Sequence, residues 1–487
     1  EFIGMKLVKG LTLLSASVML AACGSSSDDN DPIAAPAYSF ESVVNSSTES
    51  SVSYFGQSTR HALITELKAL IGSDELYVVS QDDAGRAEVI AKLKSVYAAG
   101  TIDNSDFGKN LVEQNLYTGA DASPTESNIG LKSSGTALLQ SDFSLMSSGK
   151  NLMSKMAGQD NALTQAFFGW TTPATIDSGK DDTVDNERDV PHSLVLEWFG
   201  EIAKLATDND GTTTFVDPIT GRDYQQLIQK FVLGAVAYSQ GAEDYLKAGK
   251  GLTSDNSQGK DGGAYSALEH AWDEGFGYFG AGRDYVNRTD SDNKSTPDFD
   301  QNQDGQIDIK AEYNFGHSVN AVKRDLGADE ATPVDFSTTA FNAFKAGRQI
   351  IQDNYGTDPV EDAGYHVALE AQADIALASW EKAMAATVIH YINDVIVETQ
   401  SLGTNDEATL DNRAKHWSEM KGFALGLQFS PKSTINMTDL ATVLSNMREG
   451  PALVDGADSA NFIADLEAAR TLIKDAYEFS AENTLAW

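Results

Sequence analysis

The sequence predicts an all-α protein, a large multi-helix bundle. The first observation is the stretch from Val360 to Gln400, which is apolar on nearly every face of a helix. A helix that is apolar all round is normally buried among others. The second is that shorter segments with the same helical spacing recur along the chain, whereas alternating strand patterns are scarce. With 487 residues and 41% hydrophobic content, the chain can bury a large core.

Each predicted helix rests on apolar spacing and on recognisable ends. Leu63, Leu67 and Ile71 recur at four-residue intervals, and Gly72 follows them as a stop signal. Pro191 stands at the first turn of another helix, where proline is well placed. The predicted helices are 57–71, 84–98, 191–206, 223–247, 264–287, 336–355, 360–400, 407–427, 438–447 and 459–482, with one or two short helices within 151–170.

The N-terminus has the features of a secretory signal peptide. Residues 1–4 precede a methionine and are interpreted as a cloning remnant or an upstream read-through, and residues 5–22 hold a basic start and an apolar run. The run is too short to span a membrane. It ends in Leu-Ala-Ala-Cys23, which resembles the lipobox of bacterial lipoproteins. That resemblance implies cleavage before Cys23 and a lipid anchor on its thiol.

Residues 23–37 form a predicted tether, because their Gly, Ser and Asp content cannot build a core. The residue after Cys23 is Gly24 and not aspartate, which by resemblance to lipoprotein sorting signals implies the outer membrane. Whether the folded body faces the periplasm or the cell surface stays open. The body is expected to divide at the Gly- and Ser-rich segment 249–263 into two helical subdomains, 38–250 and 264–487.

The charge of the chain excludes nucleic acid as a partner. Seventy-two acidic residues against 35 basic ones give a net charge of −37. Such a charge repels phosphate backbones and anionic lipids. It favours solubility and the binding of divalent cations, and adaptation to a salty habitat explains it equally well.

The most specific local pattern is a calcium-type loop at residues 300–312. Oxygen-bearing side chains recur at alternate positions, Gly305 stands where the loop must turn sharply, and Ile307 follows as the residue that tucks beneath it. This EF-hand-like pattern suits Ca²⁺. One departure is that the twelfth position is Ala311 and the closing acid comes one residue later. The predicted calcium ligands are Asp300, Asn302, Asp304, Gln306, Asp308 and Glu312.

Three histidine–acid pairs on predicted helices suggest a second, transition-metal site. Such pairs on facing helices are how metal sites are built in bundles, with iron or zinc as the candidate ions. The alternative for each is a hydrogen-bonded core histidine. The candidate ligands are His270 with Glu274, His366 with Glu370, and His416 with Glu419.

Gly364-Tyr365-His366, followed by a glutamate, resembles the Gly-x-His-x-x-Glu motif of imelysin-like proteins. Glu370 lies one residue later than that motif requires. The segments 269–279 and 416–427 also resemble a related, uncharacterised family of bacterial surface lipoproteins. The resemblance implies a helical, lipid-anchored protein linked to iron uptake, with an outer-membrane transporter as a candidate partner; some imelysin-like proteins are classed as metallopeptidases.

These observations lead to three functional hypotheses. The first is an outer-membrane lipoprotein that binds metal ions, with structural Ca²⁺ and a transition metal. The second is an imelysin-like metallopeptidase in which Glu370 acts as general base. The third is a non-catalytic scaffold with inert histidines. The first is preferred because no complete catalytic metal motif, such as His-Glu-x-x-His, is present in the sequence.

Overall fold

The computed structural model describes residues 34–45, 47–73, 76, 81–98, 131, 133, 137–140, 150–159, 167, 191–208, 215–260, 262–360, 362–405 and 408–487. Residues from Ala35 to Trp487 form one compact unit. The predicted anchor at Cys23 and most of its tether lie outside the described residues, as does most of the segment 160–170.

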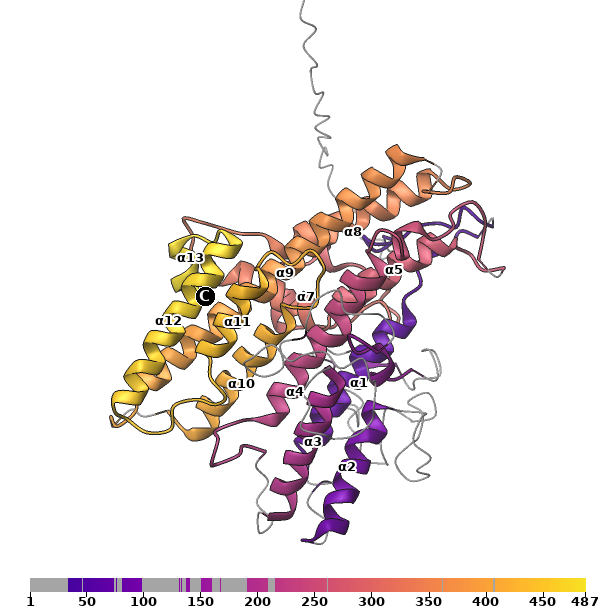
Figure 1. Cartoon of the computed structure of the whole chain (residues 1–487). Helices are drawn as coiled ribbons and strands as arrows, with labels where there is room; N and C mark the ends of the chain where they lie inside the picture. Colours follow the sequence, from indigo (N-terminus) through magenta and orange to yellow (C-terminus); the bar gives the residue numbers. More distant parts are fainter. Residues whose placement is uncertain are drawn as a thin grey trace, which may run out of the picture. The chain divides into compact units, whose positions relative to one another are not determined.

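The described part of the chain is helical, which confirms the predicted all-α class (Figure 1). Seven of the predicted helices are confirmed to within three residues at each end. The α-helices are α1 (Phe55–Ile71), α2 (Asp83–Tyr97), α3 (Pro191–Asp208), α4 (Tyr224–Val232), α5 (Ala267–Phe279), α6 (Asp290–Ser295), α7 (Gly316–Leu326), α8 (Phe336–Asp353), α9 (Ala363–Gln400), α10 (Leu410–Gly426), α11 (Met437–Asn446), α12 (Ala457–Tyr477) and α13 (Ala481–Ala486). Short elements are β1 (Leu138–Leu139), β2 (Gln306–Ile307), η3 (Met153–Lys155), η4 (Leu233–Tyr238), η5 (Gly241–Tyr245), η6 (Gly251–Thr253) and η7 (Tyr285–Asn287).

The long helix α9 is the axis of the core, as predicted. It packs along α8, α10, α12 and α7, and Trp380 and Met384 in its middle are fully buried. The prediction that it has no solvated face is wrong, because Val367, Ile375 and Val397 are 63%, 45% and 63% exposed. A helix of 38 residues is about 57 Å long, roughly twice the length of α8 or α10. In its first turns, buried residues such as Leu369 and Ala373 alternate with exposed ones, so one face of the helix is covered and the other reaches solvent.

Two other predicted helices are shorter than expected. The helix predicted over 264–287 ends at Phe279, because Gly280 adopts the left-handed conformation (φ 88°) that commonly terminates helices. The helix predicted over 459–482 ends at Tyr477, where Glu478 is left-handed, and α13 follows as a separate element.

The predicted helix 223–247 is helical over most of its length, but only its first part is an α-helix. After α4 it continues as two π-helical segments, η4 and η5, which sequence spacing did not indicate. Gly234 in η4 crosses α10 closely, since a Cβ on it would lie 2.6 Å from the Cα of Gly426. The two glycines thus allow contact between the helix backbones.

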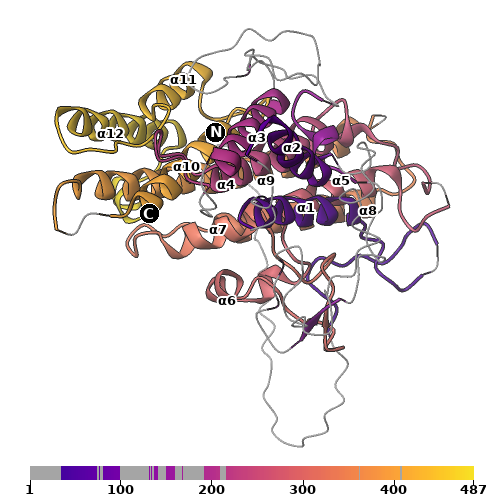
Figure 2. The same cartoon turned by 90° about the horizontal axis from the view of Figure 1, so that it is seen from below.

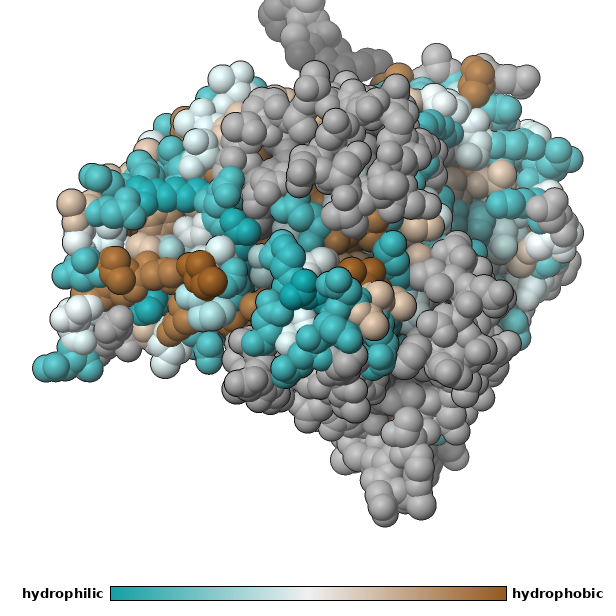
Figure 3. Space-filling model, turned by 60° about the horizontal axis from the view of Figure 1, so that its bottom comes forward, coloured by the Kyte–Doolittle hydropathy of each residue, from teal (hydrophilic) through white to brown (hydrophobic). Residues whose placement is uncertain are grey.

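The acidic segment 290–308, inserted between η7 and α7, lies outside the central layer of helices. Its helix α6 packs on α7, which in turn packs on α9 (Figure 2). Its short strand β2 pairs in parallel with β1, with Leu139 opposite Ile307. Figure 3 shows one face of the molecule, on which hydrophilic residues predominate and a short hydrophobic stripe is visible.

Candidate functional site

Helix α5 carries two acid-containing pairs on neighbouring faces. A capping box fixes its start, because the Ser266 hydroxyl accepts from the Glu269 backbone N–H while the Glu269 carboxylate accepts from the Ser266 N–H. Residues four apart share a face of a helix. Glu269 and Asp273 accordingly point into the core, and His270 and Glu274 line a cavity.

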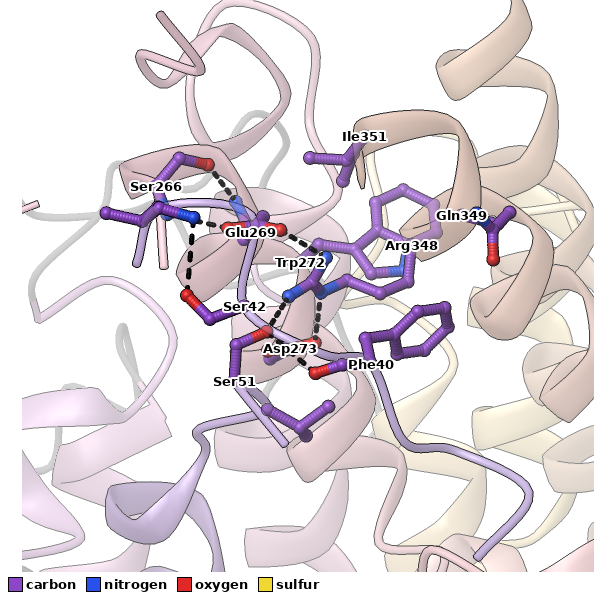
Figure 4. Close-up of polar contacts among 12 residues, drawn as sticks. Phe40, Ser42, Ser51, Ser266, Glu269, Trp272, Asp273, Arg348, Gln349 and Ile351 are labelled. Carbon is purple, nitrogen blue, oxygen red and sulfur yellow. Dashed lines mark hydrogen bonds and ion pairs between the residues drawn. The ribbon is translucent and has the colours of Figure 1, made fainter. Parts of the chain in front are cut away.

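The inward pair binds a buried arginine of α8, and we call these three residues the buried centre: Glu269, Asp273 and Arg348 (Figure 4). The Arg348 guanidinium donates to Glu269 Oε1 at 2.6 Å, to Asp273 Oδ1 at 3.1 Å and to Ser51 Oγ at 2.8 Å. All three members are completely excluded from solvent. Charge-assisted hydrogen bonds of this kind are what make a buried charge tolerable.

Asp273 holds the centre to the N-terminal segment. The Tyr38 hydroxyl donates to its Oδ1 at 2.9 Å, and the Ser53 backbone N–H donates to its Oδ2 at 3.2 Å. Burial nevertheless raises the pKa of Asp273 to about 6, because the loss of solvent outweighs the favourable charge of Arg348 and the two hydrogen bonds. The centre is fully partnered and leaves no position for a ligand, so its role is to fix α5 against α8.

Sequence reasoning did not identify Arg348, although a signal was present. It lies four residues after Phe344 and seven after Phe341, on the apolar face of the predicted helix. A charged residue on such a face needs a buried partner.

The outward pair faces a cavity of about 520 Å³ whose wall also includes Lys250, Lys260 and Asp244. His270 Nδ1 lies 3.1 Å from the Ser53 carbonyl oxygen, and its Nε2 lies 3.8 Å from Glu274 Oε1. Since a carbonyl can only accept, Nδ1 carries the proton and Nε2 is left with its lone pair. Burial lowers the pKa of His270, which favours this neutral form.

The structure does not bring the six predicted transition-metal ligands together. Glu370 lies 3.0 Å from Lys432 Nζ, and Glu419 lies 3.2 Å from Lys230 Nζ. His416 is hydrogen-bonded not to Glu419 but to Glu398 on α9, with 2.7 Å between Nδ1 and Oε1. His366 is half-buried near the start of α9. Within the described ranges, no three His, Cys, Asp or Glu side chains converge on a common point.

The calcium-type loop has the turns that its sequence indicates. Asp300 Oδ1 accepts from the Asp304 N–H at 3.1 Å, and its Oδ2 accepts from the Gly305 N–H at 3.0 Å. Gly305 has a φ of 84°, the left-handed conformation that favours glycine. Ile307 is buried, and its carbonyl accepts from the Gln140 N–H at 3.1 Å. The expected sharp turn and the tucked apolar residue are therefore both present.

The displaced acid Glu312 closes the loop from its far end. Its Oε1 accepts from the backbone N–H groups of Gln301 and Asn302, and its Oε2 accepts from that of Asp308 at 2.8 Å. Burial raises the pKa of Glu312, an effect that these three donors oppose. Glu312 thus reaches the loop although it stands one residue later than the usual position.

The oxygen donors of the loop are of the kind that Ca²⁺ takes, although its acidic side chains do not converge on a common point among the described residues. Carboxylate and amide oxygens from positions 300, 302, 304 and 308, the carbonyl of Gln306 and the carboxylate of Glu312 match the hard-oxygen set that Ca²⁺ takes. Asn302, Asp304 and Gln306 are exposed, so their side chains can turn without disturbing the core.

None of the helices in the described ranges has the length and apolar content that a membrane span requires. No curated protein and no solved structure matches the chain. A family of uncharacterised proteins matches residues 137–456, about two thirds of the chain, and this region includes α5, the buried centre and the calcium-type loop. The chain therefore belongs to the family described as Domain of unknown function (DUF4856).

Proposed function

We propose that the protein is a lipid-anchored outer-membrane protein whose helical body binds Ca²⁺ at residues 300–312. The observation that carries the proposal is the loop itself. Its oxygen donors alternate, Gly305 is left-handed, and Glu312 reaches back to the loop backbone. Lipid attachment at Cys23 rests on the lipobox-like sequence, and it would place the loop outside the cytoplasm, where Ca²⁺ is abundant.

The role of the ion would be structural. The loop lies between α6 and α7, and its two ends are joined by hydrogen bonds from the Phe299 N–H to the Glu312 carbonyl and from the Asn314 N–H to the Pro297 carbonyl. A cation held by the loop would neutralise its acidic side chains and secure the insertion to α7.

Calorimetric titration of the chain with Ca²⁺ tests this proposal. Wild type is expected to bind one ion with a dissociation constant of roughly 0.1–1 mM, the range of extracellular modules. Asp304→Asn removes one anionic ligand and should weaken binding at least about tenfold, or about 1.4 kcal/mol. Asp411→Asn, an exposed aspartate on α10, is the matched control and should bind as wild type does. Wild-type titrations without saturable heat would refute the proposal.

A second candidate function is transition-metal binding at His270 and Glu274. It is supported by the cavity that both residues line and by the Nδ1–H to carbonyl bond, which commonly orients a metal-bound histidine. Gln57 Nε2 donates to Glu274 Oε1 at 2.9 Å and holds the carboxylate in place. Iron or zinc retained by wild type after dialysis and lost in His270→Ala would support it; equal metal content in the two proteins would contradict it.

The peptidase hypothesis has less support. Glu370, its candidate base, is already paired with Lys432, whose Nζ lies 3.0 Å from its carboxylate. If the protein binds Ca²⁺ but neither binds a transition metal nor hydrolyses peptides, the scaffold hypothesis is favoured.

A further inference from the structure

A second cavity, of about 250 Å³, lies along one face of α7. Its wall on α7 is formed by Gly316, Asn320 and Lys323, which are spaced four and three residues apart and share a face. Helix α4 contributes Lys230 and α1 contributes Thr65 to the other walls. The cavity is larger than a bare ion needs, since one water molecule occupies about 30 Å³ in the liquid.

The lining of this cavity has the opposite charge to the protein. Lys230 and Lys323 contribute ammonium groups, and the described lining residues include no acid. The whole chain carries 72 acidic residues against 35 basic ones. A cationic cavity in so acidic a chain is not a consequence of composition.

The two lysines of the cavity differ in how far their charge is neutralised. The Lys323 side chain makes no hydrogen bond or ion pair in the described structure, and burial together with the charge of Lys230 lowers its pKa. Lys230 Nζ lies 3.2 Å from Glu419 Oε1, with side-chain exposures of 12% and 6%. Lys68 is close enough that burial and the charge of Lys230 lower its pKa to about 8. The charge of Glu419 attracts all three lysines, and Asp223 adds a weaker attraction for Lys68.

The remaining groups of the cavity suit an anion. Asn320 supplies an amide donor, and the Asn314 amide, which donates one N–H to Asn293 Oδ1 at 3.0 Å, has a second N–H; the Thr65 hydroxyl already donates to the His61 carbonyl oxygen at 3.1 Å. Helix α7 begins at Gly316 without a side-chain cap, because its N-cap residue is Phe315, so the partial positive charge of the helix terminus adds to that of the lysines.

We propose that this cavity binds a small oxyanion, with phosphate as its simplest form, held by Lys323 and Lys230 and oriented by the amides of Asn314 and Asn320. Ammonium groups with neutral donors are a common means of phosphate binding. None of these residues belongs to the 300–312 loop, so the proposal does not depend on Ca²⁺.

Titration of the chain with inorganic phosphate at constant ionic strength tests the proposal. Wild type is expected to bind saturably and to unfold at a higher temperature in phosphate than in chloride. Lys323→Gln should weaken binding at least about tenfold. Lys345→Gln, which removes an exposed lysine of α8, should leave it unchanged. Absence of saturable binding to wild type, or equal binding by Lys323→Gln, would overturn the proposal.

The stability of Lys323→Gln without phosphate supplies a second readout. Since this substitution removes a half-buried charge that has no partner, the variant should unfold at the same temperature as wild type or a higher one. A lower unfolding temperature would show that Lys323 has a structural role and would contradict the proposal. A parallel titration with glycerol 3-phosphate shows which form of phosphate the cavity prefers. If glycerol 3-phosphate binds more weakly than phosphate, the ligand is the free anion. If it binds equally or more tightly, the ligand is a phosphate ester.

Discussion

The buried centre and the calcium-type loop are both clusters of carboxylates, but their surroundings differ. In the buried centre, Glu269 and Asp273 are excluded from solvent and share the guanidinium of Arg348. In the loop, Asp300 and Asp304 reach solvent and their oxygens accept mainly from backbone N–H groups.

This difference separates the structural role of the buried centre from the binding role that we propose for the loop. A carboxylate whose partner is a fixed buried cation cannot exchange it without loss of the fold. A carboxylate that bonds to loop backbone can exchange those bonds for a metal ion at little cost. Among the described residues, the loop acids form one ion pair, between Asp308 and Lys310 of the same loop at 3.6 Å, so most of the acidic charge of the loop is uncompensated.

The largest expected effect is the loss of the cation of the buried centre. Arg348→Met leaves two carboxylates buried without a counter-charge and should lower the free energy of unfolding by about 3–5 kcal/mol. Urea unfolding measures this change. Lys345→Met, on the exposed side of the same helix, is the control and should stay within about 0.5 kcal/mol of wild type. A loss below about 1 kcal/mol for Arg348→Met would mean that the centre does not hold α5 to α8.

A smaller effect is expected from pH. Burial raises the pKa of Asp273 from 3.8 to about 6, so between these values the folded state holds a proton that the unfolded state has released. The contribution of this group to stability is therefore fully present below about pH 4 and lost as the pH rises through 6. In EDTA, urea midpoints of wild type should fall relative to those of Asp273→Asn between pH 4 and pH 7. A constant difference between the two proteins would contradict this assignment.

A partly exposed ion-pair cluster on α9 is intermediate in exposure between the buried centre and the loop. Glu370 and Asp374 on α9 are partly exposed and share Lys432, at 3.0 and 2.7 Å. Exposed ion pairs contribute about 0–1 kcal/mol, so Lys432→Ala should lower stability by at most about 1 kcal/mol, and less at high salt. A loss as large as that of Arg348→Met would show that exposure does not decide the strength of these pairs.

The smallest effect is expected in the loop without Ca²⁺. Because Asp304 is exposed, Asp304→Asn in EDTA should change the free energy of unfolding by no more than about 0.5 kcal/mol. In saturating Ca²⁺ the same variant should be clearly less stable than wild type. A large loss of stability in EDTA would mean that the loop acids stabilise the fold itself and do not serve to bind an ion.

Much of the fold could be predicted from sequence, because apolar spacing determines which helices can be buried. Helix α7 was not predicted, since residues 316–326 mix His, Asn, Lys and Arg with few apolar residues. The π-helical segments η4 and η5 were missed for another reason. They lie where the chain contacts helices distant in sequence, as Gly234 contacts Gly426, and spacing along one segment does not indicate such contacts.

Less of the candidate site could be predicted. Spacing along one helix correctly placed His270 and Glu274 on one face, whereas the partners of His416 and Glu419 come from other helices. The loop at 300–312 was the easiest candidate to identify, because its proposed ligands are close together in sequence. The cavity lined by Lys230 and Lys323 is formed by residues of α1, α4 and α7, so no single stretch of sequence reveals it.

A crystal structure determined in Ca²⁺ is the most direct test of the proposed function. The account predicts one ion in the loop, with oxygens of Asp300, Asn302, Asp304 and Glu312 and the Gln306 carbonyl about 2.3–2.6 Å from it, directly or with water completing the set. Crystals that hold Ca²⁺ only elsewhere, with the Asp300 carboxylate still bonded to the Asp304 and Gly305 N–H groups and no ion beside it, would contradict the account.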